Sequence, residues 1–284
     1  MASITATKKI VVVTDGNTGL GFECCLALAQ QPDMHVILAN ATSSAWTRRI
    51  VEGGIIDLAS LTSVRAFAKS ILTRKLEVFT IVCNGGVQVL NKRLNLLREH
   101  THRIVMMGSE THDPAEKTAL TVPNVSDWDQ LARDLESFDG MEAYSTSKLC
   151  NILFAKEFVR RYPTGATIWA YSPGLTPATG LFREKIIPTS VTKPHSSHKP
   201  PCISTLEYSG GYMAKLAAEE PLAPAYAIGA YIRVDELWEA SSQATDSALG
   251  KELWGKSAIW VAPKENGRRL QTKYCARLHF SSSP

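Results

Sequence analysis

The first thirty residues contain a pattern that few folds accommodate. Residues 10–13 read Ile-Val-Val-Val, a short apolar run typical of a parallel strand that is buried on both faces. The run leads into a turn with glycine at positions 16, 19 and 21, and residues 22–30 then follow a helical pattern. A strand, a glycine-rich turn and a helix in this order can hold a dinucleotide pyrophosphate on the backbone N–H groups that open the helix. An ordinary turn with incidental glycines is the alternative.

Strands and helices alternate along the rest of the chain. The hydrophobic pattern predicts strands at residues 34–39, 54–58, 77–83, 103–107, 166–171 and 230–234. It predicts helices at 60–72 and 204–219, and one that carries Tyr144 and runs to about residue 162. This alternation predicts one α/β domain, a doubly wound parallel sheet flanked by helices. The crossover between the fourth and fifth strands is short, because only residues 87–102 are available for it.

Composition argues against several other classes of protein. With 284 residues, 44% of them hydrophobic, the chain can bury a full core. A net charge of +4 with scattered basic residues disfavours nucleic-acid binding. No apolar run is long enough to span a membrane and the first nine residues lack a signal core, so we expect a cytoplasmic protein. The six cysteines show neither disulfide nor metal-site spacing, and no metal is expected.

Tyr144 and Lys148 form the strongest candidate for an acid/base pair. They are four residues apart, so on a helix they share one face. An ammonium near a phenol favours the phenolate, which lowers the pKa of the phenol toward the range useful for proton transfer. Taken alone, the pair also fits an amphipathic helix that carries a Tyr and a Lys by coincidence.

Polar residues follow several predicted strands, where open α/β sheets place their ligands. Ser109 follows the strand at 103–107, and Asn84-Gly85 follows the strand at 77–83. Pro173-Gly174 follows the strand at 166–171. Ser109 taken alone also fits a simple turn residue.

In this order, the motifs resemble the short-chain dehydrogenase/reductase family over nearly the whole chain. Residues 14–21 are similar to its TGxxxGxG turn and residues 83–86 to its NNAG strand end. Ser109, the Tyr144/Lys148 pair and Pro173-Gly174 match its catalytic serine, its YxxxK motif and its PG turn. Residues 139–151 and 178–184 resemble the branch that contains protochlorophyllide reductase, and the insertion before Tyr144 also suits retinol-dehydrogenase-like and fungal carbonyl-reductase-like proteins. The fold implied is a single Rossmann-like domain.

The resemblance implies a nicotinamide-dependent oxidoreductase that acts on a carbonyl or alcohol. Tyr144 would exchange a proton with the substrate oxygen, and Lys148 would lower its pKa and bind the nicotinamide ribose. Ser109 would hold the substrate oxygen. Asp57 would meet the adenine edge, Asn84 and Gly85 the adenosine ribose, and Thr179 or Thr176 the nicotinamide carboxamide and diphosphate. The remaining cofactor contacts implied are Thr14, Asp15, Asn17, Gly19, Leu20, Gly21, Leu58, Pro173 and Gly174.

The cofactor expected is NADP(H), with NAD(H) as the alternative. The strand at 34–39 ends in Asn40 rather than in the acidic residue that binds the ribose diol of NAD. Arg48 and Arg49 follow nearby and could meet a 2′-phosphate. Apolar residues at 181, 182, 186 and 187 suggest a bulky apolar small molecule as the substrate. They adjoin a Pro/Ser-rich segment, 183–203, which we interpret as a substrate lid within a catalytic domain of residues 1–263, whereas 264–284 reads as a disordered tail.

Three departures from the family pattern keep a second function open. Asp15 occupies the position of the first glycine of the turn, and its carboxylate should weaken binding of the pyrophosphate. Ala41 occupies the position of an arginine, and the short crossover leaves Asn91 and Asn95 without an assignable role. The alternative is a catalytically impaired Rossmann-type protein that binds a nucleotide or partner without turnover. Reduction of a C=C bond would use the same Tyr/Lys pair. The substrate, the reaction direction and the oligomeric state are not determined by the sequence.

Overall fold

The computed structural model describes residues 8–41, 51–85, 102–116, 118, 121–131, 139–179, 203–222, 225–262, 264–265 and 268–269. Within these ranges, eight strands form one sheet in the order β3-β2-β1-β4-β5-β6-β7-β8. Their bounds are β1 Lys9–Thr14, β2 Met34–Asn40, β3 Val51–Ile55, β4 Val78–Cys83, β5 Arg103–Met107, β6 Thr167–Ser172, β7 Tyr231–Arg233 and β8 Glu236–Trp238. Neighbouring strands are parallel from β3 to β7, and β8 pairs with β7 in antiparallel fashion. The predicted parallel sheet is therefore confirmed except for β8, which was not expected.

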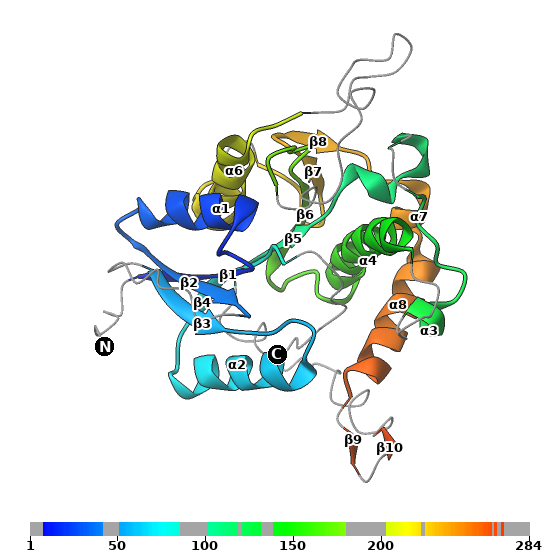
Figure 1. Ribbon diagram of the computed structural model, residues 1–284, viewed down its shortest axis with the longest axis horizontal. Helices are drawn as coiled ribbons and strands as arrows, with labels where there is room; N and C mark the ends of the chain where they lie inside the picture. Colours follow the sequence, from blue (N-terminus) through cyan, green and yellow to red (C-terminus); the bar gives the residue numbers. More distant parts are fainter. Residues whose placement is uncertain are drawn as a thin grey trace.

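Helices cover both faces of the sheet (Figure 1). Helices α1 (Gly19–Ala29) and α6 (Leu206–Ala218) lie side by side on one face, where their buried residues pack with Val11 and Val13 of β1. Ile10 and Val12 point to the opposite face, toward α2 (Leu61–Thr73). The long helix α4 (Gly140–Arg161) covers β5 and β6 on that same face, and α8 (Ser247–Trp260) packs against α4. Short helical turns at η2 (Glu110–His112), η3 (Pro114–Glu116), α3 (Trp128–Leu131) and α7 (Ser242–Thr245) complete the described helices.

The other predicted strands agree with the sequence pattern to within one residue at each end, but the third strand is shifted by three residues. The prediction placed it at residues 54–58, whereas β3 spans Val51–Ile55. Pairing with β2 sets this register, from Val36 opposite Val51 to Asn40 opposite Ile55. The chain then leaves the sheet, and Ser60 accepts a hydrogen bond from Ser63 N–H at 3.3 Å to open α2.

Several sequence predictions lie largely outside the described residues. The short crossover is described only at His102, and the proposed lid only at Ile203, which forms an isolated bridge with Leu175. Arg48, Arg49, Asn91, Asn95 and the apolar residues at 181, 182, 186 and 187 also lie outside. In the proposed C-terminal tail, β9 (Lys264–Glu265) and β10 (Arg268–Arg269) form an antiparallel pair. Of the helices described, none is long and apolar enough to cross a membrane.

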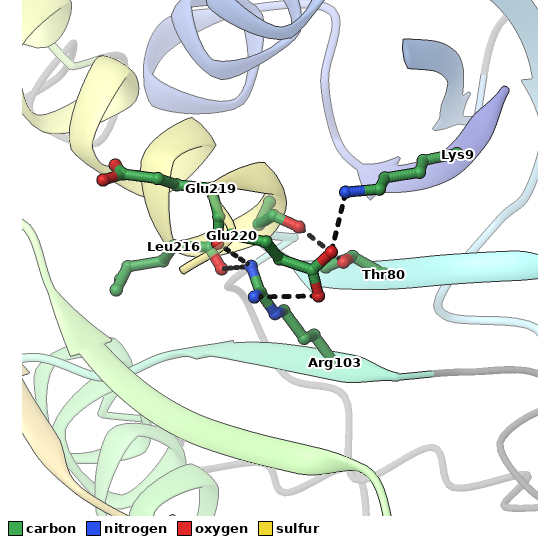
Figure 2. Close-up of polar contacts among 7 residues, drawn as sticks. Lys9, Thr80, Arg103, Leu216, Glu219 and Glu220 are labelled. Carbon is green, nitrogen blue, oxygen red and sulfur yellow. Dashed lines mark hydrogen bonds and ion pairs between the residues drawn. The ribbon is translucent and has the colours of Figure 1, made fainter. Parts of the chain in front are cut away.

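A buried arginine caps the C-terminal end of α6 (Figure 2). Arg103, the first residue of β5, donates hydrogen bonds from its guanidinium to the carbonyl oxygens of Glu219 at 2.7 Å and Leu216 at 3.4 Å. It also pairs with Glu220, which in turn pairs with Lys9 at 2.8 Å. Thr80 donates a further bond to the Ala217 carbonyl at 2.6 Å. The last carbonyls of a helix have no partner within the helix, so side chains of the neighbouring strands satisfy them here.

Candidate active site

The carboxyl ends of four neighbouring strands bring the candidate residues to one edge of the sheet. Strands β1, β4, β5 and β6 are adjacent and parallel, and they are followed by Asp15, Asn84, Ser109 and Pro173. The sequence motifs that lie up to 160 residues apart therefore meet at the edge where open α/β sheets bind ligands.

The glycine-rich turn after β1 is tied to the end of β4. Thr14 accepts a hydrogen bond from Gly85 N–H at 2.9 Å. The Asn84 amide donates to the carbonyl oxygens of Thr14 and Asp15, both at 3.1 Å. These contacts couple the two predicted cofactor segments into one rigid unit.

Two positions of this unit require glycine. A Cβ on Gly21 would lie 2.5 Å from both the Asn84 amide nitrogen and the Asp15 carbonyl oxygen, so a side chain cannot fit there. Gly19 has φ +57°, and a Cβ would meet nothing within 4 Å among the described residues. Asp15 itself adopts φ +53°, a left-handed conformation that glycine adopts without strain and that Asp tolerates better than most residues.

The same edge of the sheet carries groups that fit a phosphate-bearing cofactor. Helix α1 begins at the turn, and its N-cap residue Thr18 makes no side-chain capping bond, so the helix N-terminus is not capped by that side chain. The buried Oδ1 of Asn17 and Oγ1 of Thr179 have no hydrogen-bond partner within the described structure. Open space at Gly19 together with these polar atoms is compatible with a bound dinucleotide.

Leu58 and Asp57 follow the β3 strand. The Leu58 side chain packs so closely on Gly85 that a Cβ there would lie 2.4 Å from its Cδ1. Asp57 is exposed, and its carboxylate accepts a hydrogen bond from Ala59 N–H at 2.9 Å. That contact shapes the turn into α2, and the predicted adenine contact of Asp57 stays a prediction.

Tyr144 lies in the second turn of α4 and contacts Ser109. The helix starts at Asp139, whose carboxylate accepts hydrogen bonds from the N–H groups of Met141 and Glu142. The Ser109 hydroxyl lies close enough to the Tyr144 phenol to favour the phenolate, but burial outweighs this contact and raises the pKa of Tyr144. The two residues predicted to share the catalytic role therefore meet in the structure.

Lys148 lies one turn further along α4, on the same face as Tyr144. It is only 2% exposed, and burial lowers the pKa of its ammonium to about 8. Its Nζ atom lies 5.1 Å from the centre of the Tyr144 ring. The sequence predicted a lowered pKa for Tyr144, whereas burial raises it in the structure. The stabilisation of the phenolate by Lys148 stays a prediction. Desolvation dominates both groups and favours their neutral forms.

The turn after β6 completes the edge. Gly174 has φ +74°, which glycine adopts without strain, and it directly follows Pro173 at the end of the strand. Thr176 is 3% exposed, and its carbonyl accepts a hydrogen bond from Thr179 N–H at 3.1 Å. The segment predicted to lie near the nicotinamide is thus a tight turn between the sheet and residues outside the described ranges.

Sequence reasoning missed residues that hold the candidate pair, Tyr144 and Lys148, in place. Asn151 donates a hydrogen bond to the Met107 carbonyl at 2.9 Å and so ties α4 to β5. Thr146 accepts one from Asn124 N–H at 2.9 Å. The local sequence did not indicate these contacts, because the partner of each residue lies more than twenty residues away in the chain. The described residues contain no group of three His, Cys, Asp or Glu side chains placed to hold a metal ion.

Comparisons with known proteins point in the same direction as the geometry. No protein-family model matches the sequence. Protochlorophyllide reductase A of Triticum aestivum, a chloroplastic protein, is 28% identical over 308 positions, covering 88% of this chain and 79% of that protein. Protochlorophyllide reductase of Avena sativa is 28% identical over 303 positions, covering 86% and 97%. Both alignments are longer than the 284 residues of this chain, so these relatives contain segments that it lacks.

Solved structures share the fold. A short-chain dehydrogenase family protein from Francisella tularensis superposes with a TM-score of 0.58 at 14% identity, covering 80% of this chain and 97% of that one. A short-chain dehydrogenase/reductase variant from Serratia marcescens gives a TM-score of 0.56 at 18% identity, covering 84% and 99%. At this level of identity the agreement concerns the architecture of the sheet and its helices.

Proposed function

We propose that this chain is a short-chain dehydrogenase/reductase that transfers a hydride between NADP(H) and a carbonyl or alcohol group of a bulky apolar small molecule. An oxidoreductase of this family uses NADP(H) or NAD(H). The observation that carries the proposal is the juxtaposition of Ser109 and Tyr144 at the carboxyl edge of the sheet, with buried Lys148 one helical turn away.

The chain's own residues supply the acid/base chemistry. Tyr144 is neutral in the unliganded site because burial raises its pKa, so it can donate its proton to a carbonyl oxygen during reduction. The Ser109 hydroxyl stabilises the negative charge that develops on oxygen, and the Lys148 ammonium stabilises the phenolate left on Tyr144. The nicotinamide, when bound, supplies or accepts the hydride.

The cofactor would be held by the unit formed from the glycine-rich turn and the end of β4. The N-terminus of α1 favours phosphate charge, and glycine at position 19 leaves the backbone accessible. The Thr179 hydroxyl, which has no partner among the described residues, is a donor for the diphosphate or the nicotinamide carboxamide. These assignments agree with the roles expected from the sequence and remain part of the proposal.

The curated relatives suggest one specific substrate to include in a screen. They are protochlorophyllide reductases by name, so protochlorophyllide is the compound that these relatives add to a set of simpler carbonyls. Reduction of a C=C bond would use the same proton donor and the same cofactor. A screen should therefore contain bulky aldehydes, bulky ketones and protochlorophyllide.

Cofactor binding is the first experiment. Purified protein should quench or shift the fluorescence of NADPH with a dissociation constant in the micromolar range, and NADH serves as the comparison. Turnover of at least one compound in the screen would then support the enzyme. Binding without turnover of any compound would favour a nucleotide-binding protein that lacks catalysis, whereas absence of binding to either cofactor would contradict both proposals.

Substitution of Asp15 should strengthen cofactor binding. A carboxylate about 4 Å from a phosphate charge in water costs about 1 kcal/mol, so its removal should tighten NADPH binding roughly fivefold. Asp15→Asn tests the charge alone, since Asn also tolerates a positive φ, and Asp15→Gly additionally relieves the backbone. The measurement is the same fluorescence titration. Unchanged or weaker binding in both variants would show that Asp15 does not face the phosphates.

Proton transfer should weaken at high pH. Lys148 is charged below its pKa of about 8 and neutral above it, so stabilisation of the phenolate is lost as the pH rises through this value. We expect kcat/KM for the reduced cofactor to be constant below about pH 8 and to fall up to tenfold per pH unit above it, because kcat/KM reports the ionisation of the free enzyme. Lys148→Arg keeps its charge throughout this range, and any activity it retains should lack the descending limb. If kcat/KM of Lys148→Arg still fell above about pH 8, the ionisation responsible would belong to another group.

A further inference from the structure

A buried histidine is bonded to the main chain of Ser109. His112 belongs to the short turn η2 that directly follows Ser109, and it is 1% exposed. Its Nδ1 lies 2.6 Å from the Ser109 carbonyl oxygen, and its own main-chain N–H donates to the same oxygen at 3.2 Å. The Ser109 carbonyl oxygen therefore contacts both the side chain and the main-chain N–H of His112.

The contacts of His112 determine its tautomer. The main-chain N–H of Ser241 lies 3.1 Å from Nε2, and since this group can only donate, Nε2 must accept. The ring is therefore protonated on Nδ1, which donates to the Ser109 carbonyl. Burial lowers the pKa of His112, and this effect is larger than the opposing effect of the Ser109 contact and of nearby Asp113 and Glu116. The neutral ring is therefore the stable form.

The surroundings of His112 are themselves fixed. Ser241 caps α7 by accepting a hydrogen bond from Ala244 N–H. The Tyr231 ring packs edge-on against the imidazole, with 4.9 Å between ring centres. Glu110, two residues before His112, forms an ion pair with Arg233 of β7 at 3.1 Å, and both side chains are almost fully buried. Turn η2 is thus attached to β7 and α7 and has little freedom to move.

The orientation of Ser109 depends on this attachment. The Ser109 hydroxyl oxygen accepts a hydrogen bond from Thr111 N–H at 3.3 Å. Its own O–H group is left to face the Tyr144 phenol. The residue has an extended backbone, with φ −165° and ψ 153°, in a turn that begins immediately after it. A rotation of its peptide group would change where the hydroxyl points.

We propose that His112 is a positioning residue: its Nδ1–H bond to the Ser109 carbonyl holds the Ser109 hydroxyl against Tyr144. The catalytic consequence of this proposal rests on the proposed function. The hydrogen bond from His112 to Ser109 and its effect on Tyr144 do not require substrate. A purely structural histidine would serve only to join η2 to α7 through Ser241. The two interpretations assign the important contact to different nitrogens of one ring.

Two substitutions separate these nitrogens. The amide nitrogen of Asn lies as many bonds from the backbone as Nδ1, so His112→Asn can still donate to Ser109 but cannot reach Ser241 N–H. The amide oxygen of Gln lies one bond further out, so His112→Gln can accept from Ser241 but loses the donor at Ser109. Both variants lose one hydrogen bond and part of a buried ring, which makes them matched controls for stability.

The first readout is the 13Cζ resonance of Tyr144, assigned with Tyr144→Phe, because it responds to hydrogen bonding and ionisation of the phenol. In His112→Asn it should coincide with the wild-type resonance, whereas in His112→Gln it should shift and titrate at higher pH. Catalysis should follow, with kcat within about twofold of wild type for Asn and about tenfold lower for Gln, while cofactor affinity stays unchanged in both.

Each other outcome overturns the inference. Equal resonance shifts in the two variants, or a larger shift in His112→Asn, would show that the contact with Ser241 is the important one. A 15N spectrum that places the proton of His112 on Nε2 would remove the bond itself. A wild-type protein without turnover would contradict the proposed function alone, because the resonance of Tyr144 would still decide the role of His112.

Discussion

Replacing Tyr144 by phenylalanine should lower kcat by about 100- to 10,000-fold, the usual contribution of a positioned general acid. The substitution removes only the hydroxyl that donates the proton and that lies near Ser109. The ring remains beside Lys148, so the affinity for NADPH should stay within about twofold. Steady-state kinetics with the best substrate of the screen, combined with the fluorescence titration of the cofactor, measure both quantities.

The control for this prediction lies on the same helix. Tyr162 is the C-terminal cap residue of α4, about 27 Å from Tyr144 at 1.5 Å per residue. Tyr162→Phe makes the identical chemical change far from the candidate site and should leave kcat within about twofold. If Tyr144→Phe retained more than a tenth of the wild-type kcat, the proton donor would have to be another group.

The parts of the fold that could be predicted depend on local sequence. Residues 10–13 form a buried strand because a continuous β-branched run places apolar side chains on both faces of the sheet, and both faces must then be covered by helices. Helix α2 starts after Ser60 because the Ser60 hydroxyl caps it. Helix α8 was missed because Gly250 and Gly255 lower its helix propensity. Its stability comes from packing, such as the stacking of Trp254 on Phe154 of α4, with 5.2 Å between ring centres.

The candidate site divides in the same way. The spacing of Tyr144 and Lys148 and the glycines of the turn were visible in the sequence, since each constraint acts over a few residues. The pKa of Tyr144 was predicted in the wrong direction, because it depends on burial by distant segments. The contact of His112 with Ser241 joins residues 129 positions apart, and a histidine three residues after Ser109 gave only a weak local signal.

The cap of α6 also joins distant residues, and it affects the site through the other end of that helix. Ser209, in the first turn of α6, donates a hydrogen bond to the Pro173 carbonyl at 2.8 Å. Arg103 fixes the last turn to β5, with two helix carbonyls on its guanidinium. Helix α6 thus connects the amino end of β5 with the turn that contains Gly174.

Arg103→Met should lower the free energy of unfolding by about 2–4 kcal/mol, the range expected when a buried hydrogen-bond donor is removed and its acceptors stay unsatisfied. The Arg103 side chain is 10% exposed, and methionine fills most of its volume between the rings of Phe79 and Trp169. The destabilisation therefore comes chiefly from the missing hydrogen bonds, because the Leu216 and Glu219 carbonyls stay buried without this donor. Urea denaturation measures the change, and the melting temperature should fall by roughly 6–12 °C.

Two further variants show which part of the cluster carries this stability. Lys9→Met removes the partially exposed ion pair with Glu220 and should cost less than about 1 kcal/mol. Arg103→Lys retains the charge, but its single ammonium cannot reproduce the fork that reaches two carbonyls and Glu220, so it should recover only part of the stability. If Arg103→Met were no more destabilising than Lys9→Met, the last turn of α6 would be held by packing and by Thr80 rather than by the guanidinium. In that case the turn around Gly174 would keep its position without Arg103.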